Sequence, residues 1–186
     1  MAWSSPATAS TGVTVPASFW NTNGRDNLNY LHSPPACLAT RTSALSITTA
    51  TFTNISFNGT DIYDTDTMHD PVTNNTRITI NTAGVYHVWG ATEFAANATG
   101  LRRTALVLNA AQKLAGAYEG TPGGAQNGIL EAHAVYKFAA TDFVELYVYQ
   151  SSGAGLNILG TGNTGSDIDG IGPPCYFGAQ WVGDGT

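Results

Sequence analysis

The pattern of apolar and polar residues along most of the chain predicts short β-strands and no long helix. Residues 77–81 alternate strictly, which is the period of a strand that buries one face. Further strands are expected from Ala36 onward and at 51–57, 85–94, 101–109, 129–138, 143–150 and 175–182. Asn, Gly and Pro occupy the connections and favour tight turns. Strands at this spacing predict an all-β antiparallel sandwich or barrel.

Residues 1–35 differ from the rest of the chain. They begin as a Ser-, Thr-, Ala- and Pro-rich segment, which predicts an extended arm. A short helix is expected to follow, with Ser18 as its cap, and Ser33-Pro34-Pro35 would end it. Gly24 in the middle of this helix weakens the prediction, because glycine costs about 1 kcal/mol relative to alanine. We therefore expect two units, an arm at 1–35 and a sandwich domain at 36–186.

The arm carries large apolar side chains but too little apolar surface to form its own core. The simplest interpretation is a frayed tail. Aromatic residues on a solvated tail would promote aggregation, so we favour a docking arm that buries them against a partner. The anchoring residues of this arm are predicted to be Trp3, Phe19, Trp20, Arg25 and Leu28.

Two of the expected strands are apolar on both faces. In 85–94, Tyr86, Val88 and Phe94 point one way and Val85 and Trp89 point the other. In 143–150, Val144, Leu146 and Val148 point one way and three aromatic residues point the other. An antiparallel strand with one solvated face should be polar on that face. The second cover would come from another chain or from the arm, unless these are simply exposed tyrosines. The predicted contacts between chains are Trp89, Phe143, Tyr147 and Tyr149.

Charged residues make up only 11% of the chain, and the net charge is −6. Without a basic stripe, neither nucleic-acid binding nor attachment to an anionic membrane is expected. No apolar run approaches the roughly 20 residues of a membrane span. The first residues contain no secretory signal, so we expect synthesis in a cytoplasm.

The densest polar cluster lies between Asp61 and Asp70. Oxygen-rich loops of this kind can hold calcium, and the candidate ligands are Asp64, Asp66 and Asp70. The spacing does not match an EF-hand loop, and aspartates in loops more often form turns with their own backbone. No other cofactor is expected. The chain has no nucleophile elbow and no phosphate-binding loop, so we expect no enzyme.

Several segments resemble the jelly rolls of complement globular heads and tumour necrosis factors. The similar segments are 83–88 (AGVYHV), 142–148 (DFVELYV) and 176–180 (YFGAQ). The amino-acid sequences of residues 20–28, 63–70 and 145–150 resemble those of bacteriophage virion proteins with that fold. The resemblance implies a two-sheet jelly-roll sandwich that forms a homotrimer and is displayed on a capsid or a tail.

This resemblance implies a role in binding and assembly. We expect a capsid decoration protein on the virion surface, made in the host cytoplasm, whose partners are its own copies and the major capsid protein. The alternatives are a tail-tip or fibre adhesin attached to a tail protein, and a soluble cellular ligand-binding jelly roll. In this fold the first and last strands are neighbours, so Cys37 and Cys175 are candidates for a disulfide, although a reducing cytoplasm argues against it.

Overall fold

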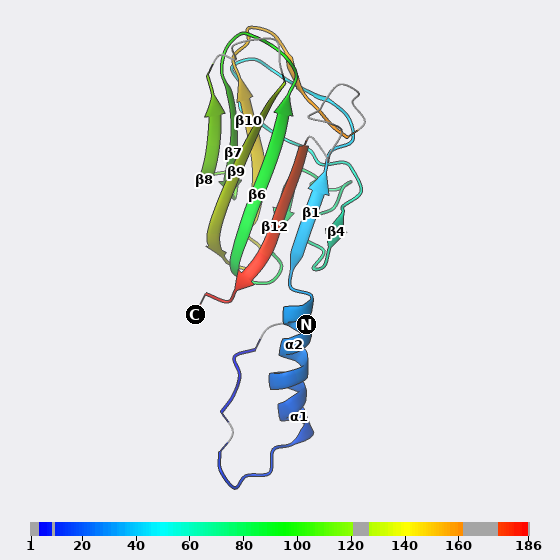
Figure 1. Cartoon of the computed structure of the whole chain (residues 1–186), viewed down its shortest axis with the longest axis vertical. Coiled ribbons are helices and arrows are strands. Elements are labelled where there is room, and N and C mark those ends of the chain that lie inside the picture. Colours follow the sequence, from blue (N-terminus) through cyan, green and yellow to red (C-terminus); the bar gives the residue numbers. More distant parts are fainter. Residues whose placement is uncertain (1–3, 9, 121–126, 162–174, 186) are drawn as a thin grey trace.

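The computed structural model describes residues 4–8, 10–120, 127–161 and 175–185. Its strands form two antiparallel sheets packed face to face (Figure 1). Sheet A runs in the order β9 (Gly128–Phe138), β6 (Gly84–Phe94), β12 (Cys175–Gly183), β1 (Ala36–Thr40) and β4 (Tyr63–Asp64), and β11 (Leu156–Ile158) joins β2 (Leu45–Ile47) to the end of β6. Sheet B runs in the order β8 (Gln112–Glu119), β7 (Arg102–Leu108) and β10 (Phe143–Gln150), with β3 (Thr53–Asn54) and β5 (Arg77–Thr79) both paired to the far edge of β10.

The core lies between the two sheets and follows the alternation of the longest strands. Tyr86 and Val88 of β6 face Leu146 and Val148 of β10, and all four are fully buried. Each such side chain contributes about 1.5–3 kcal/mol by leaving water. The expectation of an all-β antiparallel sandwich is therefore confirmed, with its core built from the residues that alternation selects.

Gly90 marks a close approach between the sheets. A Cβ atom on Gly90 would lie 2.7 Å from both methyl carbons of Leu146, which is fully buried. We expect Gly90→Ala to lower the free energy of unfolding by about 1–3 kcal/mol, because the added methyl overpacks the core. Urea denaturation measures this change. Gly120→Ala is the matched control, since a Cβ there meets nothing within 4 Å; equal losses in both variants would contradict the overpacking.

The N-terminal segment is more ordered than an extended arm. Helices α1 (Ala17–Trp20) and α2 (Asn27–His32) are joined by a π-helical segment, η1 (Asn21–Asp26), into one helix that projects beyond the end of the sandwich (Figure 1). Ser18 is not its cap, because the helix begins at Ala17 and its N-cap residue is Pro16, which makes no side-chain cap bond. Gly24 does not end the helix but lies inside the π-helical segment.

The chain before this helix runs back along it (Figure 1). The amide of Asn27 donates to the carbonyl of Ser4 (2.8 Å) and accepts from the backbone N–H of Ser4 (3.2 Å). One helical turn away, the backbone N–H of Ala7 donates to the side chain of Asn23 (2.7 Å). Asparagine side chains thus hold the first segment against the helix, which requires no hydrophobic core.

The last turn of α2 belongs to the sandwich and not to the arm. Tyr30 is only 3% exposed, and its ring meets Trp181 of β12 edge-on with 4.9 Å between centroids. Burial raises the pKa of Tyr30 to about 12. The predicted boundary at residue 35 is therefore too late, because Tyr30 closes the end of the core.

Strands β1 and β12 are neighbours, as the resemblance implies, but their register separates the two cysteines. Cys37 lies opposite Ala179, whereas the carbonyl of Cys175 accepts a hydrogen bond from the backbone of Arg41 (3.3 Å). Four residues of strand span roughly 13 Å, and a disulfide needs Cα atoms about 4.4–6.8 Å apart. The expected proximity is wrong, and both cysteines are free and buried.

Both thiols are expected to be unreactive in the folded protein. Burial raises the pKa of the Cys175 thiol to about 12, and burial with nearby Asp64 and Asp61 raises the pKa of Cys37 well above its ordinary value. Because the thiolate is the reactive form, a thiol reagent should label neither residue in native buffer. Two free thiols per chain should appear in denaturant without reductant. Their absence there would show that a disulfide forms despite the register.

Candidate functional site

The outer face of sheet A carries large side chains where a solvated sheet is normally polar. The strand registers align one row across five strands. From β9 to β4 this row consists of His133, Trp89, Gly178, Leu38 and Tyr63. It contains no carboxylate, lysine or arginine, and its large side chains are aromatic or aliphatic apart from His133.

Trp89 lies flat across this row. A Cβ atom on Gly178 would collide with the six-membered ring of Trp89, so glycine is what lets the indole cover β12. The ring of His87 lies 5.1 Å from that of Trp89, and His87 stacks on His133 with 5.6 Å between centroids. The three rings form a flat aromatic surface, as expected for a contact with another molecule.

Exposed aliphatic side chains extend this surface. Val135 of β9 is 66% exposed and Val182 of β12 is 54% exposed. The acid on the same face is paired, because Glu131 accepts a hydrogen bond from the hydroxyl of Tyr176 (2.8 Å). The association face is defined here as Trp89, His133, Leu38, Tyr63, Val135 and Val182. Three of its residues, Tyr63, Val135 and Val182, are large apolar side chains exposed to solvent.

The other predicted contact residues lie on the opposite side of the molecule. Phe143, Tyr147 and Tyr149 belong to β10 and face outward from sheet B, whereas Trp89 faces outward from sheet A. Only Trp89 is therefore on the association face. Within the chain, side chains of sheet B cover part of these rings, and the prediction that a second chain or the arm also covers β10 stays a prediction.

That cover comes from residues near β3 and β5 and from β10 itself. The guanidinium of Arg77 lies 4.8 Å from the ring centroid of Phe143. Phe52 packs against Tyr149 with 4.9 Å between centroids. The hydroxyl of Tyr147 donates to Glu145 (3.3 Å). Residues at 52 and 77 are distant in sequence from β10, so the alternation within one strand could not reveal them.

The three aspartates predicted to bind calcium do not converge on one point. Asp64 accepts hydrogen bonds from the backbone N–H groups of Asp66, Met68 and His69 (2.9–3.2 Å). Asp70 accepts from the backbone of Val72 (2.8 Å) and of Thr73, and these bonds hold its pKa below the ordinary value. Asp64 and Asp70 thus form turns with their own backbone, which is the alternative that the sequence also offered for this loop.

One different group does come within 4.8 Å among the described residues, namely Cys37, Asp61 and Asp64. Few of its oxygen and sulfur atoms are free to bind a metal ion. Asp61 is paired with His69, whose Nδ1 lies 2.8 Å away, and burial raises the pKa of Asp61. The buried Cys37 favours its protonated thiol. This group therefore stabilises the β4 loop and makes a poor metal site.

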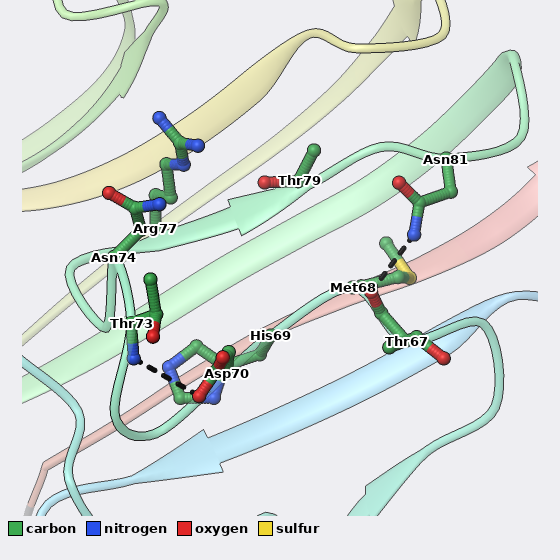
Figure 2. A pocket seen from close by; sticks show the side chains of 9 residues that line it. All are labelled: Thr67, Met68, His69, Asp70, Thr73, Asn74, Arg77, Thr79 and Asn81. Atoms are coloured by element: carbon green, nitrogen blue, oxygen red, sulfur yellow. Dashed lines mark hydrogen bonds between the residues drawn. The ribbon is translucent and has the colours of Figure 1, made fainter.

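A pocket of about 250 Å³ opens beside this loop (Figure 2). Figure 2 shows Arg77 and Asn74 over one end and Asn81 with Met68 at the other. The polar groups mostly bind the loop itself, since Asn81 donates to the carbonyls of Asp66 and Thr67 (2.8 and 2.9 Å).

The projecting helix exposes a second apolar surface. Trp20, Leu28 and Leu31 are 63%, 66% and 54% exposed, and they define the arm stripe. The described helices contain none with the length and apolar character of a membrane span. Of the other predicted anchors, Phe19 packs edge-on against Trp20, Arg25 pairs with its neighbour Asp26 (2.8 Å), and Trp3 lies outside the described residues.

Comparison with solved structures identifies the fold. The chain is similar to the globular domain of a zebrafish complement 1qA protein, with a TM-score of 0.52 and 14% identity over 80% of this chain and 97% of that chain. It is also similar to murine APRIL at pH 5.0, with a TM-score of 0.55 and 10% identity over 80% and 98% of the two chains. No protein-family model and no curated protein sequence matches. The predicted jelly-roll sandwich is confirmed, and identities this low show the fold alone.

Proposed function

We propose that this protein is a structural protein of a tailed bacteriophage, a homotrimer that decorates the exterior of the capsid. The observation that carries the proposal is the pair of exposed apolar surfaces on one small jelly roll: the association face on sheet A and the arm stripe beyond its end. A monomeric soluble protein rarely exposes large contiguous apolar patches. Two separate surfaces call for two kinds of contact.

The association face is assigned to self-association. It is broad, aromatic and free of unpaired carboxylates, which is the composition of the centre of a protein interface. It also belongs to the regular, rigid part of the molecule, so three copies can pair without rearrangement. Trp89 is its central residue, because its indole covers Gly178 of β12, the middle strand of the row, and is already half-buried.

The arm stripe is assigned to the particle surface. It projects past the ends of β1 and β12, away from the strands of the association face (Figure 1). Three arms on one trimer would bind as a multivalent unit, so a modest affinity for each arm suffices for firm attachment. The partner is the major capsid protein, reached after synthesis of both proteins in the host cytoplasm.

The assignment to a phage particle is supported by the likeness of 20–28, 63–70 and 145–150 to phage virion jelly rolls. Immunogold labelling of purified virions in negative stain tests it. Gold over the whole capsid surface is expected. The absence of the protein from virions would overturn the proposal, and gold confined to the tail tip would replace it by the adhesin.

A tail-tip or fibre adhesin is the second candidate. It is favoured by a depression on the outer face of sheet B that places exposed aromatic rings beside Arg103 and Lys113. Such a depression is suited to a ligand and has no role in attachment to a shell.

A further inference from the structure

Sheet B carries a depression of about 280 Å³ on its outer face. One wall is a row of side chains from four neighbouring segments. Phe52, next to β3, packs on Tyr149 of β10; Tyr149 lies opposite Arg103 of β7; and Arg103 lies opposite Tyr118 of β8. The guanidinium of Arg103 lies 5.7 Å from the ring centroid of Tyr149. The row is thus three aromatic rings with one cation between them.

Small residues form the floor of this depression. Ala105 and Gly116 lie opposite each other next to the row, and a Cβ atom on Gly116 would lie 2.8 Å from the carbonyl oxygen of Thr104. A bulge shifts the register between Leu106 and Val107. As a result Lys113 passes beside Gly116, where its Cε would also be 2.8 Å from that Cβ. The second cation therefore lies over Gly116, next to the row.

The two cations here are unusual for this chain. The protein has 7 basic against 13 acidic residues, and the fully buried Arg41 and Arg102 use their guanidinium groups on backbone carbonyls. Arg103 and Lys113 are exposed, and within the described chain neither forms an ion pair. Glu145, the acid on the same face of β10, is only 6% exposed and is bonded by Asn54 (2.9 Å). The depression is a positive site on an acidic protein.

We propose that this depression binds an acidic oligosaccharide whose sugar rings carry carboxylates. Tyr118 and Phe52 are 77% and 56% exposed and offer flat apolar faces with no partner on their outer side. The C–H face of a pyranose packs on such rings, while hydroxyl groups remain in water. A guanidinium matches a carboxylate with two parallel hydrogen bonds, and Lys113 supplies a second charge.

The small number of cations at the depression favours an acidic sugar over a nucleic acid as the ligand. Affinity for nucleic acids grows with the number of neutralised phosphates, and this face offers only two exposed cations on a chain of net charge −6. The site also stays accessible in the assembly, because it lies on the opposite side of the sandwich from the association face. Binding at the depression therefore does not depend on whether the proposed trimer is attached to a capsid or to a tail.

The test is calorimetric titration of the full-length protein with trigalacturonate and with its methyl ester, which removes the charges but keeps the rings. Trigalacturonate should bind with a dissociation constant of about 1 mM or lower, and the ester at least about 10-fold more weakly. Arg103→Met, Lys113→Met and Tyr118→Ala should each weaken trigalacturonate binding by about 5- to 10-fold. Lys137→Met is the control, a lysine on sheet A whose loss should leave binding unchanged.

Three results would overturn the proposal. One is equal binding of the acid and its ester, which would remove the carboxylate from the recognition. Another is a failure to locate binding at this site: either trigalacturonate does not bind at about 10 mM, or all four variants bind it with the same affinity as the natural protein. The third is tighter binding of an oligothymidylate than of trigalacturonate, which would make the depression a single-strand nucleic-acid site. Thermal melts of each variant exclude loss of the fold as the cause.

Discussion

Val135→Asp combined with Val182→Asp is expected to abolish the proposed trimer and leave monomers. Both valines are more than half exposed in the single chain, so the substitutions leave the core intact. In the trimer they would bury two carboxylates per subunit on the association face. Unpaired buried charges cost several kcal/mol each, which exceeds what a face of this size can offset. Light scattering of the full-length chain at micromolar concentration should report three chains for the natural protein and one for the variant.

Val72→Asp is the matched control. Val72 is 86% exposed in the loop before β5, outside the association face, so the same change of charge should leave a trimer. A double variant that remains trimeric would move the contact to another surface. A natural protein that is monomeric at micromolar concentration would contradict the association face altogether.

The long apolar segments of the sequence located their strands well. The expected strand at 85–94 is observed as β6 (Gly84–Phe94), and the strand expected at 143–150 is β10 itself. Strand β8 was not predicted, because Ala115, Gly116 and Ala117 present no contrast between apolar and polar faces and a bulge interrupts the period. The strand expected at 51–57 pairs only over Thr53–Asn54, although Ile55 and Phe57 are fully buried.

The site depends on register, which a local pattern does not encode. Trp89 was identified from its own strand, but its neighbours Gly178 and Leu38 come from strands far away in sequence. The sequence feature that could have indicated this contact is Gly178, which directly follows Phe177. Adjacent strands likewise did not imply adjacent cysteines, because Cys37 and Cys175 sit at opposite ends of the same ladder.

The second large effect is expected from substitutions in the arm stripe. In the full-length protein, we combine Trp20→Ser with Leu28→Ser and Leu31→Ser. The variant should still fold and form the proposed trimer, but it should no longer bind virions from which the natural protein is missing. Each of these side chains is worth about 1.5–3 kcal/mol when fully buried. The loss is repeated in three arms, so occupancy should fall by more than about 100-fold. Substitution is preferable to deleting residues 1–31, because that deletion removes Tyr30 from the core.

The control carries three substitutions on polar positions of the same helix, Asn21→Ser, Thr22→Ser and Asn29→Ser, all exposed. Asn, Thr and Ser have nearly equal helix propensities, so this control preserves the helix and leaves the arm stripe intact, and it should decorate particles normally. Occupancy is measured by quantitative gel analysis of repurified particles after mixing. If the stripe variant decorates as fully as the control, the attachment lies on the jelly roll, and the exposed Trp20, Leu28 and Leu31 must instead pack against the arms of the other subunits.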